Sequence, residues 1–358
     1  MKGISVFLND PNYQQWERYI HQMNASGFKG IFTSLHIPED NPNIYVERLR
    51  KLGGIAKTYH MDLVADVSPK SLGYLGYSWE NANELIDWGV TGLRVDYGID
   101  DKTIADLSKQ MKVALNASTI TEESINRIIH HDGDLSNMEA WHNYYPRPET
   151  GLGVEDFNQK SQWLKSIGLK VMTFIPGEET LRAPLYERLP TLEKHRKTST
   201  FLAFVEFDHN EWVDHVYVGD TGISETSIDQ IQHYINEKAF LLRIDVLTKD
   251  EEILQLLNIN HNNRMDAARD VIRSVESRGY ASKGNTMIKP LGIEARSKGS
   301  VTIDNCNYGR YQGELQITKV DLPKDNRVNV IGKIVAEDIS ILDYMKAGAK
   351  FKFLFSTN

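Results

Sequence analysis

The sequence predicts an α/β protein in which a (β/α)8 TIM barrel is followed by a smaller, mostly β domain. Over the first two thirds of the chain, short apolar strands alternate with amphipathic helices eight times, and the strands start ~20 to ~45 residues apart. After about Asn236 this alternation ends, and strands separated by turn residues follow. An open doubly wound sheet is the alternative, but it usually has fewer units and a glycine-rich first turn, and the sequence shows neither.

The barrel strands are predicted from short runs of apolar residues. In order, they cover residues 4–8, 30–37, 62–68, 92–98, 113–118, the start of 138–151, 170–177 and 214–220. The clearest helices cover residues 11–25 and 46–59, where apolar side chains recur at helical spacing. Four glycines stand shortly before strands, at positions that end the preceding helix: Gly27, Gly53, Gly89 and Gly168. The repeat is therefore indicated by the glycine positions in addition to the apolar runs.

The last third of the chain has a different pattern. Strands are predicted at residues 239–247, 300–304, 310–318, 328–335 and 349–355, and helices at 250–257, 266–278 and 338–345. A segment of roughly 120 residues is a typical size for an independent domain. We therefore expect a barrel domain of residues 1–235 and a second, β-rich domain of residues 236–358.

Composition limits the class of protein. The net charge is −8 over 358 residues, and no basic run is visible, so nucleic-acid binding is not expected. The single Cys306 excludes an internal disulfide and fits a reducing compartment. No apolar run approaches the ~20 residues of a membrane helix, and the N-terminal apolar run is too short for a signal peptide. We expect a cytoplasmic protein without a membrane partner.

Polar residues stand at the predicted strand ends, where barrel enzymes place their sites. They are Asp66, Arg94, Asp96, Asn116, Asn143, Tyr145, Arg147, Gly177 and Asp220. Because side chains alternate along a strand, Asp66 on the third strand and Arg94 and Asp96 on the fourth should line the barrel mouth. Asp66 and Asp96 are then expected on neighbouring strands, ~5 Å apart at the backbone, where two carboxylates can share acid and base roles. Alternatively, Arg94 forms a structural ion pair with one of them.

The sixth strand is unusually polar. Its stretch MEAWHNYYPRPETG, residues 138–151, places Trp141, Asn143, Tyr145 and Arg147 on one face, with His142 and Tyr144 on the other. Amide, phenol and guanidinium groups on one face destabilise a sheet unless they meet a ligand or each other. We interpret this face as a ligand-binding wall.

The residues that several other types of site or reaction require are not found in the predicted positions. A metal site would need two histidines and a carboxylate, but His36, His142 and His215 differ in strand and parity, so no metal and no other cofactor is predicted. No lysine stands at a strand end for a Schiff base, and no GxSxG motif is present. The long loop after the seventh strand either closes over an anionic substrate through Arg182 or forms a solvated helix.

A set of segments in order along the chain resembles the bacterial 6-phospho-N-acetylmuramidase family. The segments are LRVDYG, ALNAS, HNYYPRPETGL, FIPG, RAPLYERLPTLEKHR and DHVYVGD in the barrel, then NRMDAARDVIRS and NYGRYQGELQI. The resemblance covers nearly the whole chain. One departure is Arg182-Ala183-Pro184, where relatives are expected to have Arg-Gly-Pro, and it leaves the geometry of this loop open.

The resemblance implies a cytoplasmic glycoside hydrolase of peptidoglycan recycling. Its substrate would be a phosphorylated amino-sugar disaccharide, N-acetylmuramic acid 6-phosphate joined to N-acetylglucosamine, and its second domain would be a cyclophilin-like β-barrel. The acid and the base or nucleophile would come from Asp66, Asp96 and Asp220. Substrate-binding residues would be Arg94, Asn116, Asn143, Tyr145, Arg147, Gly177 and Arg182. The substrate's own acetamido group is an alternative nucleophile.

Two other functions are weighed against this hydrolase. One is a different barrel reaction on phosphosugars, by an epimerase, aldolase or lactyl-ether lyase; the missing strand-end lysine weakens the aldolase version. The other is a binding or prolyl-isomerase role for the second domain. A homodimer is left open, as is the choice between retention and inversion.

Overall fold

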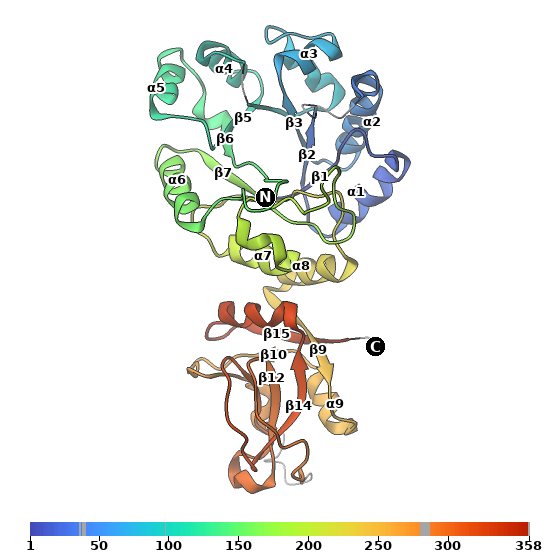
Figure 1. The fold of residues 1–358 in the computed structure, drawn as a ribbon, viewed down its shortest axis with the longest axis vertical. Helices are drawn as coiled ribbons and strands as arrows, with labels where there is room; N and C mark the ends of the chain where they lie inside the picture. The colour runs from blue at the N-terminus through green and yellow to red at the C-terminus, as the bar shows by residue number, and fades with distance from the viewer. Residues whose placement is uncertain (36, 38–40, 97, 280–286, 357–358) are drawn as a thin grey trace. The chain divides into compact units, whose positions relative to one another are not determined.

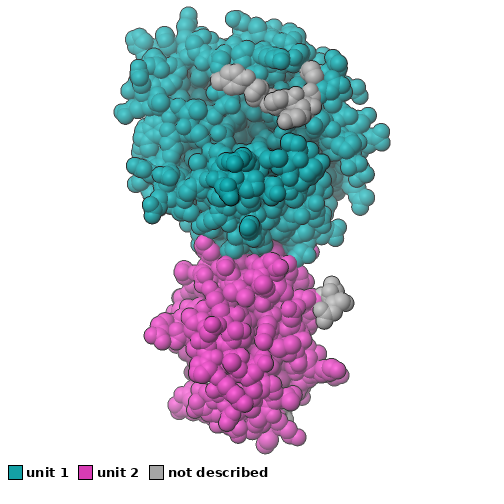
Figure 2. Space-filling view, viewed as in Figure 1, with its two compact units in different colours: residues 1–228 teal, residues 229–358 magenta. Residues whose placement is uncertain are grey.

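The protein consists of two compact units, which Figure 2 colours separately. The computed structural model describes residues 1–35, 37, 41–96, 98–279 and 287–356. Unit 1 is Met1–Ile228 and unit 2 is Asp229–Asn358. The division falls within helix α8 (Glu225–Glu237), which leads into the first strand of unit 2.

Unit 1 is a closed barrel of eight parallel strands, which confirms the predicted fold class. In chain order the strands are β1 (Lys2–Ser5), β2 (Gly30–Ser34), β3 (Asp62–Val67), β4 (Gly92–Val95), β5 (Lys112–Asn116), β6 (Met138–Trp141), β7 (Lys170–Ile175) and β8 (His215–Val218). The barrel closes where β1 pairs with β8. Every strand therefore presents its carboxyl end at the same mouth.

Helices surround the strands, as Figure 1 shows. They are α1 (Trp16–Ala25), α2 (Tyr45–Thr58), α3 (Pro69–Leu75), α4 (Asp101–Ser108), α5 (Glu122–His130), α6 (Val154–Ser166), α7 (Thr200–Asp208) and α8. Capping residues set several of the starts: the side chains of Ser68, Asp100, Thr121 and Ser199 accept a hydrogen bond from a backbone amide in the first turn. A short 3-10 helix, Ala82–Trp88, follows α3 before β4 begins.

The interior of the barrel is filled by large side chains. Its buried cluster is Phe7, Phe32, Ile37, Val64, Ala114, Trp141, Met172, Phe174, Leu189 and Tyr217. The Tyr217 ring occupies the space that a Cβ would need at Gly3 and Gly30, with its atoms 2.2 and 2.0 Å from those positions. Only glycine fits at these two points, because any side chain would overlap the ring. The barrel interior below the polar mouth is therefore filled mainly by apolar side chains.

Unit 2 is built on a seven-stranded sheet that curves into a nearly closed barrel, with strand order β10-β15-β9-β14-β12-β13-β11. The strands are β9 (Ala239–Val246), β10 (His261–Asn262), β11 (Val271–Arg273), β12 (Ser300–Asp304), β13 (Leu315–Thr318), β14 (Val328–Ile334) and β15 (Lys350–Phe355). All pairs are antiparallel except β15 with β9. The helices are α9 (Glu251–Leu257) and the 3-10 segments Glu276–Gly279, Cys306–Tyr311 and Ala336–Tyr344.

The helix predicted at residues 266–278 is wrong. Residues 271–273 instead form β11, which pairs with Gln316, Ile317 and Thr318 of β13. Burial decides the outcome, because Ile272 is 1% exposed and packs in the sheet, whereas the surrounding charges pair with one another. The local sequence favours a helix, and long-range strand pairing overrides that preference.

Candidate active site

A buried chain of polar contacts crosses the barrel mouth. Arg94 donates from Nη1 to Asp66 Oδ1 over 2.8 Å and from Nη2 to Asn143 Oδ1. The second carboxylate oxygen of Asp66 accepts from the Ser34 hydroxyl over 3.1 Å. The ion pair and its two hydrogen bonds therefore connect three barrel strands, β2, β3 and β4, with the segment after β6. The structural ion pair that the sequence predicted as one alternative for Arg94 is therefore present, and Arg94 forms it with Asp66.

The register of β3 and β4 separates the two candidate carboxylates. Asp66 pairs with Arg94, so Asp96 stands two positions further toward the solvent instead of directly opposite Asp66 as expected. Asp66 is 8% exposed, while Asp96 is partly exposed. Asp66 is thus buried at the inner end of the mouth, whereas Asp96 lies nearer the solvent.

Asp96 is held by one neighbour. Asn116 at the end of β5 donates from Nδ2 to Asp96 Oδ1, and Asn116 Oδ1 accepts from the Ser118 backbone amide over 2.9 Å. Because a backbone amide can only donate, this second bond fixes which way the Asn116 amide points. The other carboxylate oxygen of Asp96 has no hydrogen-bond partner among the described residues. Asp96 is therefore held in one orientation through a single one of its two carboxylate oxygens.

The sixth strand ends earlier than the sequence indicates. β6 stops at Trp141, which lies in the barrel interior as predicted, and His142 points to the helices, where its Nε2 is 2.9 Å from the Ser161 hydroxyl. Burial lowers the pKa of His142 to about 3, so this imidazole is neutral. Asn143 and Tyr145 reach the mouth, where the Tyr145 hydroxyl is 3.4 Å from that of Ser118.

Tyr144 contradicts the predicted alternation. Its ring packs edge-on against Phe7, Phe32 and Phe174, so it faces the mouth instead of the helices. The reason is that the chain leaves the pleat after β6: the Tyr145 backbone amide donates to Pro190 O over 3.0 Å, away from the barrel ladder. Sequence alternation could not find this residue, because the rule holds only while the strand continues.

The segment 143–151, which we call the binding wall, is fastened to the loop after β7. Thr191 donates from Oγ1 to Asn143 O over 2.8 Å, and Arg196 donates to the carbonyl of Tyr145 over 2.9 Å. Glu193 accepts from the backbone amides of Glu149 and Gly151. Arg196 is 5% exposed and pairs with Glu193 over 2.7 Å. The interpretation of residues 185–196 as a solvated helix is therefore wrong.

The lowered pKa of Glu193 is consistent with these contacts between the binding wall and the loop after β7. Hydrogen bonding from Arg196, followed by the two backbone amides, lowers the pKa of Glu193 to about 2, although partial burial opposes the shift. Glu193 is thus ionised at any pH at which the protein would work. Its charge keeps the binding wall in one conformation.

Asp220 and Gly177 are inside the protein and not on its surface. Asp220 is 0% exposed and accepts from the backbone amides of Gly177, Arg182 and Leu189. Burial raises the pKa of Asp220, and those three amides oppose the rise. A Cβ at Gly177 would lie 2.4 Å from Gly222 O, so this glycine allows close packing. Both residues shape the loop after β7, and neither has the access to substrate that was expected.

Glu178 fills the place where barrel enzymes commonly bind phosphate. Its carboxylate accepts from the Thr200 backbone amide at the start of α7 over 2.8 Å, and from the hydroxyls of Ser224 and Ser227 at the start of α8 over 2.8 and 2.5 Å. Burial disfavours the charge, but these hydrogen bonds outweigh it and lower the pKa of Glu178. The two helix N-termini after β7 and β8 are thus already occupied by an anion of the protein.

Two arginines at the mouth lack a carboxylate partner among the described residues. Arg182 lies with its guanidinium 4.6 Å from the centre of the Phe7 ring and donates to the Tyr144 hydroxyl over 2.9 Å. Arg147 is exposed, and only its backbone carbonyl takes part in hydrogen bonds. A cavity of about 280 Å³ adjoins Arg182, lined by residues of the loops after β1, β7 and β8. The mouth therefore offers the positive charge of Arg182 beside this cavity.

Metal ligands do not gather in the part of the chain that the structure describes. No group of three or more His, Cys, Asp or Glu residues there is arranged to hold a metal ion. His36 lies outside the described residues, as does Tyr97. No described helix has the length and apolar character that crossing a membrane requires.

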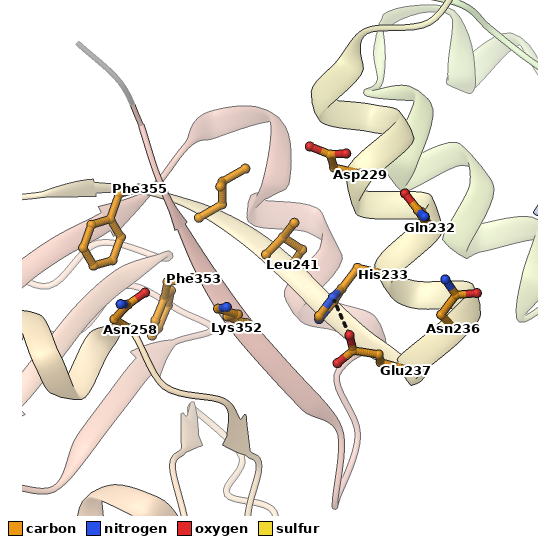
Figure 3. Close-up of a pocket in the computed structure, with 11 residues that line it drawn as sticks. Asp229, Gln232, His233, Asn236, Glu237, Leu241, Asn258, Lys352, Phe353 and Phe355 are labelled. Atoms are coloured by element: carbon orange, nitrogen blue, oxygen red, sulfur yellow. Dashed lines mark ion pairs between the residues drawn. The ribbon is translucent and has the colours of Figure 1, made fainter. Parts of the chain in front are cut away.

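Unit 2 has a groove of its own. The groove has a volume of about 580 Å³. Figure 3 shows that it is bounded by α8, β9 and β15, with His233 paired to Glu237. The side chains of Asp229, Gln232 and Asn236 line the α8 wall, and Phe353 and Phe355 lie across from them. None of the predicted site residues lies in this unit, so the candidate site belongs to the barrel alone.

Comparison with known proteins gives a consistent result over the whole chain. The N-terminal domain of the family described as 6-phospho-N-acetylmuramidase matches residues 2–233, and its C-terminal domain matches residues 240–354. A conserved Enterococcus faecalis protein of unknown function has a similar crystal structure, with 45% identity, a TM-score of 0.90, and 99% of this chain and 96% of that chain covered. An uncharacterized B. cereus protein is similar at 25% identity and a TM-score of 0.74, with 99% of each chain covered. No functionally curated protein matched the chain.

Proposed function

The chain belongs to the 6-phospho-N-acetylmuramidase family, and from this premise we propose which residues of the barrel mouth perform the hydrolysis. The enzyme is a glycosidase that cleaves N-acetylmuramic acid 6-phosphate from N-acetylglucosamine in peptidoglycan recycling. We place this reaction in the cytoplasm, with the disaccharide attacked from its non-reducing end. The single observation that carries the assignment is Asp96: oriented by Asn116, partly exposed, and with one carboxylate oxygen to which no described residue donates a hydrogen bond.

Asp96 is the general acid in this proposal. A glycosidase must deliver a proton to the leaving oxygen, which requires a carboxyl group that reaches the substrate and has a free oxygen. Of the three predicted aspartates, Asp66 has both oxygens engaged by Arg94 and Ser34, and Asp220 is fully buried. Only Asp96 meets both conditions.

Asp66 then acts through its neighbours. Its charge holds Arg94, which in turn fixes Asn143 by its Oδ1, so that the Asn143 amide NH2 remains available to a ligand. Because Asp66 is so engaged, it is a poor nucleophile, and this favours the substrate's own acetamido group for that role. An amide donor such as Asn143 suits the oxygen of an acetamido group.

The binding wall supplies the sugar contacts in this proposal. Asn143 and Tyr145 lie at the mouth, where they contact Arg94 and Ser118, and Glu193 and Arg196 hold the backbone of the segment that also carries Arg147. All the proposed catalytic and binding residues precede residue 235. We therefore assign catalysis to residues 1–235 and treat residues 236–358 as a separate domain.

The test is release of free N-acetylglucosamine from the phosphorylated disaccharide. Asp96→Asn should lower kcat by about 10²- to 10⁴-fold, the usual contribution of a general acid. Asp106→Asn is the matched control, because Asp106 is an exposed carboxylate on α4, paired only with Lys109. An Asp96→Asn enzyme with full activity would remove Asp96 from the mechanism. A wild-type enzyme that releases no N-acetylglucosamine would overturn the reaction itself.

The acetamido nucleophile has its own test. Replacing the acetyl group on the muramic acid nitrogen by fluorinated acetyl groups makes the carbonyl oxygen less nucleophilic. The rate should fall with each added fluorine if that oxygen attacks. A rate that does not change with fluorination would return the nucleophile to a carboxylate of the protein.

A further inference from the structure

The geometry points to Arg182 as the residue that binds the 6-phosphate of the substrate, in the cavity between the loops after β1, β7 and β8. The inference rests on the proposed function and deepens it, because it locates the charged end of the substrate. Two other positions for the phosphate are excluded. One is the pair of helix N-termini after β7 and β8, and the other is Arg147.

The helix N-termini are excluded by the protein's own carboxylate. Glu178 accepts hydrogen bonds from Thr200, Ser224 and Ser227, which are the donors that a phosphate would need there. A phosphate at this point would have to displace the half-buried carboxylate of Glu178 and then lie beside it. Gly219 leaves no room either, since a Cβ there would lie 2.2 Å from Leu189 O. The anion must therefore bind elsewhere.

Arg182 is preorganised for an anion. Its guanidinium lies against the Phe7 ring, Nη1 donates to the Tyr144 hydroxyl over 2.9 Å, and its backbone amide donates to Asp220 over 3.2 Å. Rings on one side and a phenol at one nitrogen restrict the side chain without neutralising it. No carboxylate pairs with Arg182 in the described part of the chain. The remaining donors of its planar fork match the spacing of phosphate oxygens.

The adjoining cavity has a suitable size and lining. Its volume of about 280 Å³ is roughly nine times the ~30 Å³ share of one water, so it accommodates a phosphate group together with the sugar carbon that carries it. Asn9, Asn12 and Thr180 contribute polar lining. Asp10 is the acidic residue of the lining, and its two oxygens accept from the Asn12 amide and from Trp16 Nε1. The Asp10 charge is thus partly satisfied within the protein.

Arg147 is the rival cation, and it has none of these features. It is exposed, it does not line the cavity, and no ring or side-chain hydrogen bond restricts it among the described residues. Muramic acid carries a second anion, the carboxylate of its lactyl ether. A charge effect at either arginine therefore has two sources, phosphate or carboxylate, which the substrates must separate.

The experiment measures KM for the disaccharide with and without its 6-phosphate, using the full-length enzyme. Arg182→Met should raise KM for the phosphorylated substrate on the order of 10- to 100-fold and leave the unphosphorylated substrate unaffected, so that the preference for phosphate disappears. Arg182→Lys should keep part of the preference, because lysine is a point charge without the planar fork. Arg147→Met should keep all of it. Circular dichroism confirms that each variant is folded.

A second readout does not depend on turnover. Inorganic phosphate should inhibit the wild-type enzyme competitively and should inhibit Arg182→Met far more weakly. Tyr144→Phe removes the hydrogen bond that orients the guanidinium, and it should produce a smaller rise in KM for the phosphorylated substrate than Arg182→Met does.

The outcomes separate the two proposals. If wild-type enzyme hydrolyses the phosphorylated disaccharide but Arg182→Met retains the preference for phosphate, the phosphate assignment is overturned and the proposed function stands. If the preference disappears in Arg147→Met instead, the site lies at the binding wall. If Arg182→Met loses affinity equally for both substrates, Arg182 binds the lactyl carboxylate. Failure of the wild type to release N-acetylglucosamine would count against the function alone.

Discussion

The two ends of the barrel contain the same kinds of residues but use them differently. At the base, Glu139 at the start of β6 accepts from Trp141 Nε1 over 2.9 Å and lies 3.4 Å from both Lys112 and His215. Lys112 also pairs with Asp62 over 2.8 Å. At the mouth, the Asp66 to Arg94 pair is as tightly engaged, but one oxygen of Asp96 has no partner within the described part of the chain.

The difference shows what distinguishes a site from a structural cluster. The buried Glu139 at the base and the buried Asp66 and Arg94 at the mouth each lie against an opposite charge, as burial favours. The mouth additionally keeps hydrogen-bonding capacity that no described residue uses: one oxygen of Asp96, the amide NH2 of Asn143, and the donors of the Arg182 guanidinium other than the Nη1 that binds Tyr144. At the base, by contrast, the described side chains of Glu139, Asp62 and Lys112 each lie against a group of opposite charge. Unused capacity at an accessible place, and not charge alone, marks the site.

The largest expected effect is at the base. Glu139→Ala should lower the free energy of unfolding by about 3 to 5 kcal/mol, because it leaves Lys112 with one partner fewer and Trp141 Nε1 without an acceptor. Activity should be unchanged at a temperature where the variant is folded. Urea unfolding and initial rates measure the two quantities. The control is Glu123→Ala, which breaks an exposed pair with Arg127 and should cost almost nothing.

A loss of activity in folded Glu139→Ala would break the comparison between the two ends. It would mean that the base communicates with the mouth through the barrel interior. An unfolding free energy equal to that of the Glu123→Ala control would show instead that the base cluster does not stabilise the barrel.

The pH dependence of stability sharpens the same contrast. Burial opposes ionisation of Glu139, but hydrogen bonding from His215 and the charge of Lys112 outweigh it and lower the pKa of Glu139 from 4.5 to about 2. A depressed carboxyl pKa stabilises the fold above pH 4.5, and that stability is lost as the pH falls toward 2. The loss is worth about 3 kcal/mol.

The measurement compares wild type with Glu139→Gln by urea unfolding between pH 6 and the lowest pH at which both fold. Subtracting one curve from the other removes the contribution of the other carboxylates. The wild type should lose more stability than the variant as the pH falls. Parallel curves would show that Glu139 is not ionised preferentially in the folded protein.

The smallest expected effect is at the mouth. Asn116→Ala removes the donor that orients Asp96 without touching its charge. kcat should fall on the order of 10- to 100-fold, since a small displacement of a catalytic group is costly, while KM changes little. The matched control is Ser118→Ala, which leaves the backbone amide bonded to Asn116 in place. A change in KM alone would reassign Asn116 to substrate binding.

Much of this arrangement was predictable because its causes are local in sequence. The apolar runs and helical periodicity identify the eight strands of the barrel, and alternation along β3 and β4 places Asp66, Arg94 and Asp96 at the mouth. Segments such as LRVDYG and HNYYPRPETGL identify the family. These signals depend on neighbours within a few residues, so they survive without knowledge of the fold.

Only the tertiary structure decided which polar residues were left unengaged. Asp220 and Gly177 look like mouth residues in sequence, yet they bond to each other across 43 positions and are buried. Arg196 holds the binding wall from 51 residues away, and Tyr144 turns inward because Pro190 draws the chain out of the pleat. The strand register sets Asp66 against Arg94 and leaves Asp96 above them. Each of these outcomes depends on a partner distant in the chain, and burial and hydrogen bonding choose that partner only when the barrel closes.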